Sequence, residues 1–144
     1  MPTISVRKDD ATAKIALLLQ DIQELTRLEE TSQEILKQPV EQMLDSAPDS
    51  LNHLEERKTG LMRQVDRHSI ELIECRRRLG AAEAESPALR EADGRLMLAL
   101  RGLQRQHQDN ERILRLRMTL LGEDIRNVER SRQFLRATLQ SVAA

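Results

Sequence analysis

Three histidines and one cysteine are the side chains that could bind a metal ion or transfer a proton: His53, His68, His107 and Cys75. Di-iron centres in four-helix bundles place a glutamate three residues before a histidine. Here those positions hold a serine, a valine and a glutamine, so the pattern fails at each histidine. His68 and Cys75 share a predicted helix face but are separated by about 10 Å of helical rise, too far to share one ion unaided. We therefore expect no metal site and no cofactor.

Glycine and serine spacing gives no indication of a catalytic loop. The five glycines are scattered and form no phosphate-binding motif, and the sequence has no Gly-x-Ser-x-Gly nucleophile motif. Tryptophan and tyrosine are absent and Phe134 is the one aromatic residue, so the aromatic walls typical of ligand pockets and base-stacking surfaces are missing. We predict that the protein is not an enzyme.

Polar residues occupy three positions at which helical spacing predicts apolar side chains: Lys58, His107 and Asn110. Polar groups inside a helical seam can fix the register of the helices or their oligomeric state, at a cost in stability. We predict this register-setting role for all three residues. The alternative is that each lies at the edge of the seam with its polar end in water.

Hydrophobic periodicity predicts that these residues lie on three long helices. The first spans about residues 10–45, after a frayed start at residues 1–8, and is kinked near Pro39 because proline lacks a backbone donor. Residues 46–50 are expected to form a turn in which Ser50 caps the second helix, at about 50–79. Ser86 and Pro87 are expected to begin the third, at about 87–140.

The predicted second helix has the most regular pattern, because its seam alternates steps of three and four residues over four heptads. Its members are Leu51, Leu54, Lys58, Leu61, Val65, His68, Leu72, Cys75 and Leu79. Met62 and Ile73 widen this stripe, which indicates more than one neighbouring helix. The composition, 39% hydrophobic and 33% charged, is typical of long helices. We predict an all-α fold: one domain over residues 1–144, an elongated antiparallel bundle of three to four long, coiled-coil-like helices.

The predicted third helix is too long for the second. At 1.5 Å per residue the second spans about 45 Å and an unbroken third about 80 Å. The apolar stripe beyond about Leu116 then lacks a partner in the chain, which marks an interface, unless the helix breaks at Gly122 and folds back. In a further alternative, Pro39 and Pro48 only kink one long helix, giving a two-arm hairpin. The expected partner-binding residues are Met118, Leu121, Ile125, Val128, Phe134, Leu135 and Leu139, with Arg126, Arg130 and Arg132 beside them.

Charge is distributed unevenly although the net charge is only −1. Residues 1–60 carry 7 basic and 12 acidic side chains, whereas residues 101–144 carry 9 basic and 5 acidic ones. A basic helix can meet nucleic acid, anionic lipid or an acidic protein surface, or pair with the acidic first part of the chain. The near-neutral total argues against nucleic acid. The longest apolar run is five residues, so we expect no membrane insertion and a cytoplasmic location.

The spacing Leu51-x-x-Leu54-x-x-x-Lys58-x-x-Leu61, after an acidic leucine-rich helix and before a helix ending in Cys-Arg-Arg-Arg-Leu-Gly80, resembles the middle of FlgN-type flagellar export chaperones. In its second half that family typically shows Asn-x-x-Asn-Gly followed by aliphatic residues, and this sequence has His107-Gln-Asp-Asn110-Glu111-Arg-Ile113-Leu114. Asn110 matches the second asparagine, but His107 and Glu111 replace the first asparagine and the glycine. The tyrosine often found near the family's C-terminus is absent.

The resemblance implies a cytoplasmic chaperone that binds hook-associated (hook–filament junction) proteins and delivers them to the flagellar type III export apparatus. It also implies that the C-terminal region binds the client. An amphipathic client helix would dock on the stripe of residues 118–139, and the nearby arginines would steer an acidic client surface. The rival interpretation is a coiled-coil adaptor or self-assembling structural protein, with the stripe buried in a homodimer or higher oligomer. Nucleic-acid binding is the third hypothesis and would weaken steeply with salt.

Overall fold

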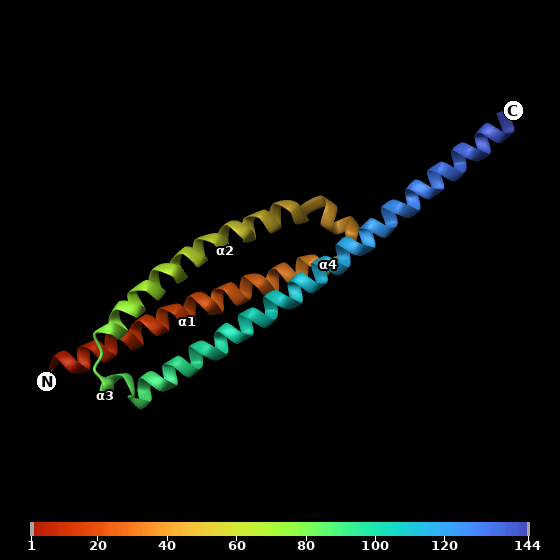
Figure 1. Cartoon of the computed structure of the whole chain (residues 1–144). Helices are drawn as coiled ribbons and strands as arrows, with labels where there is room; N and C mark the ends of the chain where they lie inside the picture. The colour runs from red at the N-terminus through yellow and green to blue at the C-terminus, as the bar shows by residue number, and fades with distance from the viewer. Residues whose placement is uncertain (1, 144) are drawn as a thin grey trace. The chain divides into compact units, whose positions relative to one another are not determined.

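The computed structural model describes the backbone of residues 2–143 and the side chains of residues 9–39, 42 and 49–141. Its elements are α1 (Pro2–Leu36), α2 (Val40–Arg77), α3 (Ala81–Ala84) and α4 (Pro87–Ala143) (Figure 1). The predicted all-α helical bundle is therefore confirmed. By internal contacts the chain forms two units, Met1–Asn110 and Glu111–Ala144. The second unit consists of the last part of α4 alone.

The connection between α1 and α2 differs from our expectation. α1 begins at Pro2, where we expected a frayed start, and ends at Leu36. Pro39 adopts φ −54° and ψ 145°, an extended conformation that takes the chain out of the helix, and α2 begins at the next residue. Because the chain already reverses at residues 37–39, no second reversal is needed at residues 46–50. The predicted turn there is wrong, Ser50 is not a helix cap, and α2 continues through this segment.

The second connection follows the sequence signals closely. α2 ends at Arg77, the short helix α3 follows, and α4 begins at Pro87. The Ser86 hydroxyl accepts a hydrogen bond from the Leu89 backbone N–H at 3.3 Å, as expected of a residue capping a helix N-terminus. α4 is helical through Gly122, where we had considered a break.

The hydrophobic core of the first unit lies where α1, α2 and the start of α4 meet. Its centre consists of fully or almost fully buried side chains: Ala11, Ile15, Leu18, Leu72 and Leu89. Further apolar side chains from α2 and α4 pack against this centre, among them Val65, Cys75 and Leu96. All nine predicted seam residues of α2 are at least partly buried, whereas Met62 and Ile73 are about half exposed. The heptad pattern of α2 therefore identified its buried face.

Ion pairs fix α1 and α2 as antiparallel neighbours. Lys14 pairs with Glu71 at 2.5 Å, and Glu24 pairs with Arg57 at 3.1 Å. Early residues of α1 thus meet late residues of α2. The hydrogen bond from Lys14 is the main cause that lowers the pKa of the Glu71 carboxyl. In the view of Figure 1, α1 runs between α2 and the first part of α4. Within the described residues, every helix is too short or too polar to cross a membrane.

Candidate functional site

Glu29 is the centre of a buried polar cluster formed by α1, α2 and α4. The Lys58 Nζ lies 3.1 Å from the Glu29 carboxylate, and only 13% and 10% of these two side chains are exposed. The Asn110 Nδ2 donates to both the backbone carbonyl and the carboxylate of Glu29, at 2.7 Å each. His107 Nδ1 lies 3.5 Å from the same carboxylate. The structure thus brings together the three polar residues that the sequence marked as register-setting.

Electrostatics in this cluster favour a charged Glu29. Burial by itself raises the pKa of the Glu29 carboxyl, but hydrogen bonds from Lys58 and Asn110 and the nearby positive charge outweigh it. The resulting pKa lies below the ordinary value of 4.5. Lys58 also pairs with the exposed Glu55, and the Asn110 side-chain carbonyl accepts a bond from Gln106. Glu29, Lys58 and Asn110 are therefore hydrogen-bonded, as a buried polar network requires, whereas the His107 side chain is 56% exposed at the edge of the cluster.

Sequence reasoning missed Glu29, although the sequence contained a signal for it. The signal is a series of alternate four- and three-residue steps on α1 that runs through polar as well as apolar residues. The unbroken series is Ala11, Ile15, Leu18, Ile22, Leu25, Glu29, Ser32 and Leu36, and every member is buried. A charged residue at a seam position predicts a partner across the interface.

A second buried acidic residue of α1, Asp21, also has a partner on α2. Its carboxylate lies 2.7 Å from His68 Nδ1, and 10% of the Asp21 side chain and 14% of the His68 side chain are exposed. His68 is therefore bonded within the α1–α2 interface. Among the described residues, the structure holds no group of three or more His, Cys, Asp or Glu side chains suited to a metal ion.

A cleft of about 650 Å³ lies beside the Glu29 cluster. Its size falls within the roughly 300–1,000 Å³ range of typical binding pockets. Apolar side chains from all three helices line it, and the Lys58–Glu29 pair forms part of its polar lining. The lining residues are Leu25, Glu29, Glu55, Lys58, Thr59, Met62, Leu100, Leu103, Gln104 and His107. We call this the central cleft.

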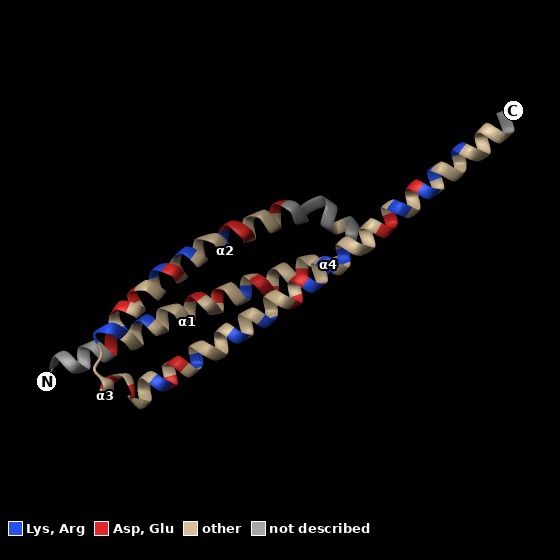
Figure 2. Ribbon diagram, in the orientation of Figure 1, with Lys and Arg blue, Asp and Glu red and all other residues tan. Residues whose placement is uncertain are grey.

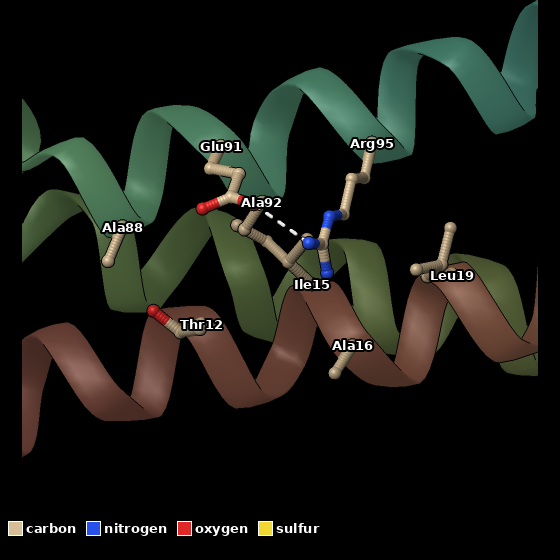
Figure 3. Close-up of a pocket in the computed structure, with 8 residues that line it drawn as sticks. All are labelled: Thr12, Ile15, Ala16, Leu19, Ala88, Glu91, Ala92 and Arg95. Carbon is tan, nitrogen blue, oxygen red and sulfur yellow. Dashed lines mark hydrogen bonds and ion pairs between the residues drawn. The ribbon is translucent and has the colours of Figure 1, made fainter.

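A smaller groove of about 270 Å³ lies between α1 and the start of α4 (Figure 3). Ile15 is almost fully buried beneath it, and alanines on both helices leave the space open. Arg95 extends from α4 toward α1 and pairs with Glu91 of its own helix at 2.7 Å. The groove therefore has one ion pair on its rim, and alanine, threonine and aliphatic side chains form the rest of its lining.

The second unit exposes the apolar residues that we predicted to bind a partner. Helical spacing of about 100° per residue places six of them within one sector of about 100°. These six, which we call the C-terminal stripe, are Met118, Leu121, Ile125, Val128, Leu135 and Leu139, and each is at least 43% exposed. The C-terminal stripe is therefore a continuous exposed apolar surface along this part of α4.

The other four residues predicted to bind a partner lie on two different sides of this helix. Arg132 falls inside the C-terminal stripe, between Val128 and Leu135. Phe134, Arg126 and Arg130 lie on the opposite side of the helix by the same spacing, and Phe134 is 71% exposed. Basic residues are distributed along this part of α4 in Figure 2. The stripe is therefore an apolar surface with Arg132 inside it and Arg136 at its edge, at the angle of Met118.

A comparison of the sequence with protein-family models finds no match, and comparisons with curated proteins and with solved structures find none either.

Proposed function

We propose that this protein is a non-enzymatic binding protein that holds an amphipathic helix of a client on its C-terminal stripe. The observation that carries the proposal is the exposure of the stripe over residues 118–139. A helix docked there would bury one face of each partner along successive turns, in the manner of helix-in-groove recognition. The first unit, with its packed core and bonded polar cluster, would serve as the scaffold.

The client proposed is a hook-associated protein, and the chaperone would deliver it from the cytoplasm to the flagellar type III export apparatus. Two features support this more specific proposal. One is the resemblance of residues 51–61 and 107–114 to FlgN-type chaperones. The other is that the family's client-binding region and the exposed stripe coincide in the C-terminal part of the chain.

Arg132 favours a client over symmetric pairing of two stripes. In a parallel homodimer through this face, the two Arg132 side chains would approach each other at equivalent positions of the seam, and like charges there are destabilising. A client helix with an acidic residue opposite Arg132 would instead gain a charge-assisted bond. The proposed client helix is therefore apolar on one face and carries at least one carboxylate.

The test compares two double variants of the full-length chain. Leu121→Asp with Val128→Asp places two charges in the stripe, whereas Leu116→Asp with Phe134→Asp places two charges on the opposite, equally exposed side. Binding to a purified hook-associated protein is measured by calorimetry, and folding by circular dichroism. We expect the stripe variant to lose binding by a hundredfold or more and the control to bind as the unmodified protein does. Equal binding by both variants would refute the proposal.

A further inference from the structure

We propose that the central cleft of the first unit binds the C-terminal stripe of a second copy of this protein. This contact between copies uses the same stripe as the proposed client and therefore competes with it, but it does not depend on what the client is. It gives each exposed surface a defined occupant when no client is present.

The walls of the central cleft have the form of an incomplete helical bundle. Met62 on α2 and Leu100 on α4 both line it, yet 48% and 39% of their surfaces remain exposed. Leu25 of α1, which is buried, forms part of the same lining. Three helices that present apolar side chains to one space provide the receiving side of a four-helix layer. The matching shape is an amphipathic helix.

Charge identifies which helix is suited to this space. The segments of α1 and α2 around the cleft, residues 24–37 and 49–60, contain seven acidic and four basic residues, and the third wall, residues 99–107 of α4, adds Arg101 and Arg105. Residues 111–141 contain seven arginines and four acidic residues, which is the opposite balance. Such complementarity steers two surfaces together and disfavours pairing of like with like. A second copy therefore supplies a helix of the required charge.

One residue on each side makes the match more specific. Arg132 interrupts the C-terminal stripe, so any surface that covers the stripe has to offer that guanidinium an acceptor. Glu55 lines the central cleft, and 68% of its side chain is exposed although it contacts Lys58. The carboxylate has acceptor capacity beyond the Lys58 bond. We therefore pair Arg132 of one copy with Glu55 of the other.

The test uses one variant on each surface of the full-length chain. Leu100→Asp charges the cleft and leaves the stripe intact, whereas Ile125→Asp charges the stripe and leaves the cleft intact. Leu98→Asp is the matched control, because Leu98 is 67% exposed on α4 and is not among the lining residues of the central cleft. Light scattering and sedimentation from low-micromolar to several hundred micromolar protein report the mass, and circular dichroism reports folding.

We expect the unmodified protein and Leu98→Asp to associate with rising concentration, and each single-surface variant to associate at least tenfold more weakly. A mixture of Leu100→Asp with Ile125→Asp should associate although neither does alone, because the intact stripe of one meets the intact cleft of the other. Met62→Glu replaces Leu100→Asp if the latter unfolds. Added salt should weaken the association.

Three results would overturn the proposal. A chain that stays monomeric over the whole range has no such contact. A Leu100→Asp variant that associates as tightly as the unmodified protein would show that stripes pair with each other and leave the cleft unused. A mixture that fails to associate would also exclude a contact between unlike surfaces. Leu100→Asp keeps the stripe, so it should still bind the client. Loss of self-association with retained client binding can therefore be distinguished from a failure of the proposed function.

Discussion

Replacing Lys58 with methionine tests whether the Glu29 cluster is held by charge. Methionine keeps most of the aliphatic bulk of Lys58 but leaves the Glu29 carboxylate, which is 10% exposed, without its cation. Removing one partner of a buried pair typically costs about 3–5 kcal/mol. Asn110 still donates to Glu29 and some water reaches both side chains, so we expect a loss of about 2–3 kcal/mol in the free energy of unfolding near neutral pH.

The pH dependence of this loss gives the sharper test. In the unmodified protein the pKa of Glu29 is below its ordinary value, so its contribution to stability is present above about pH 4.5 and is lost as pH falls through the lower, folded value. Without Lys58 the effect of burial is opposed less, and the pKa of Glu29 should rise. Protonation then relieves the unpaired charge, and the cost of Lys58→Met should shrink between about pH 7 and about pH 4.

Urea unfolding followed by circular dichroism at both pH values measures these differences. Two controls separate charge from packing. Arg57→Met removes a more exposed pair with Glu24 and should cost less than about 1 kcal/mol. Lys58→Met combined with Glu29→Leu removes both charges and should cost less than Lys58→Met alone. A cost that is equal at both pH values, or as large in the double variant, would refute our account of the cluster.

Three further outcomes are expected. Leu72→Ala should destabilise the protein by about 2–4 kcal/mol in thermal or urea unfolding, because Leu72 is buried in the core, whereas Ile73→Ala on the adjacent exposed position should cost less than about 1 kcal/mol. Gly122→Ala should raise helix content and stabilise α4 locally by about 0.5–1 kcal/mol, because an added Cβ meets nothing within 4 Å, and a loss of helicity would contradict a continuous helix there. Backbone amides of residues 111–141 should exchange with deuterium faster than those of residues 15–36, since most side chains of the former are exposed, and equal protection in a monomeric sample would contradict this.

The parts of the fold that the sequence predicted well are those in which local pattern and tertiary packing agree. The unbroken seam of α2 identified its buried face, and Ser86 with Pro87 identified the start of α4. In both cases the feature depends on neighbouring residues alone, either through helical period or through a cap hydrogen bond.

Where local signals competed, the sequence did not decide between them. Pro39 and the segment around Pro48 both disfavour helix, and we placed the reversal at the second of these positions. A single reversal is enough to pair α1 with α2, and the ion pairs between the two helices select the one at Pro39. That selection depends on contacts between residues more than thirty positions apart, such as Glu24 with Arg57, which no local window contains.

In the candidate site, too, local pattern identified residues but not their contacts across helices. Lys58 and Asn110 were found because each interrupts an apolar pattern, but their common partner could not be assigned without knowing how the helices align. The face on which Phe134 lies could have been counted from the sequence, because helical rotation alone separates it from Leu121. Grouping it with the stripe relied on residue type where angular position was the better guide.

The hydroxyl groups of the last part of α4 bear on how selective a partner surface there would be. Thr119 and Thr138 each donate to the carbonyl of the residue four positions earlier in their own helix, at 3.0 and 2.9 Å. Both threonines also lie outside the C-terminal stripe by helical spacing, so neither hydroxyl sets the angle or alignment of a helix that covers the stripe. Discrimination among partners would then come from the length of their apolar face and the placement of an acidic residue opposite Arg132. Such recognition tolerates more sequence variation in the partner than recognition through several specific hydrogen bonds.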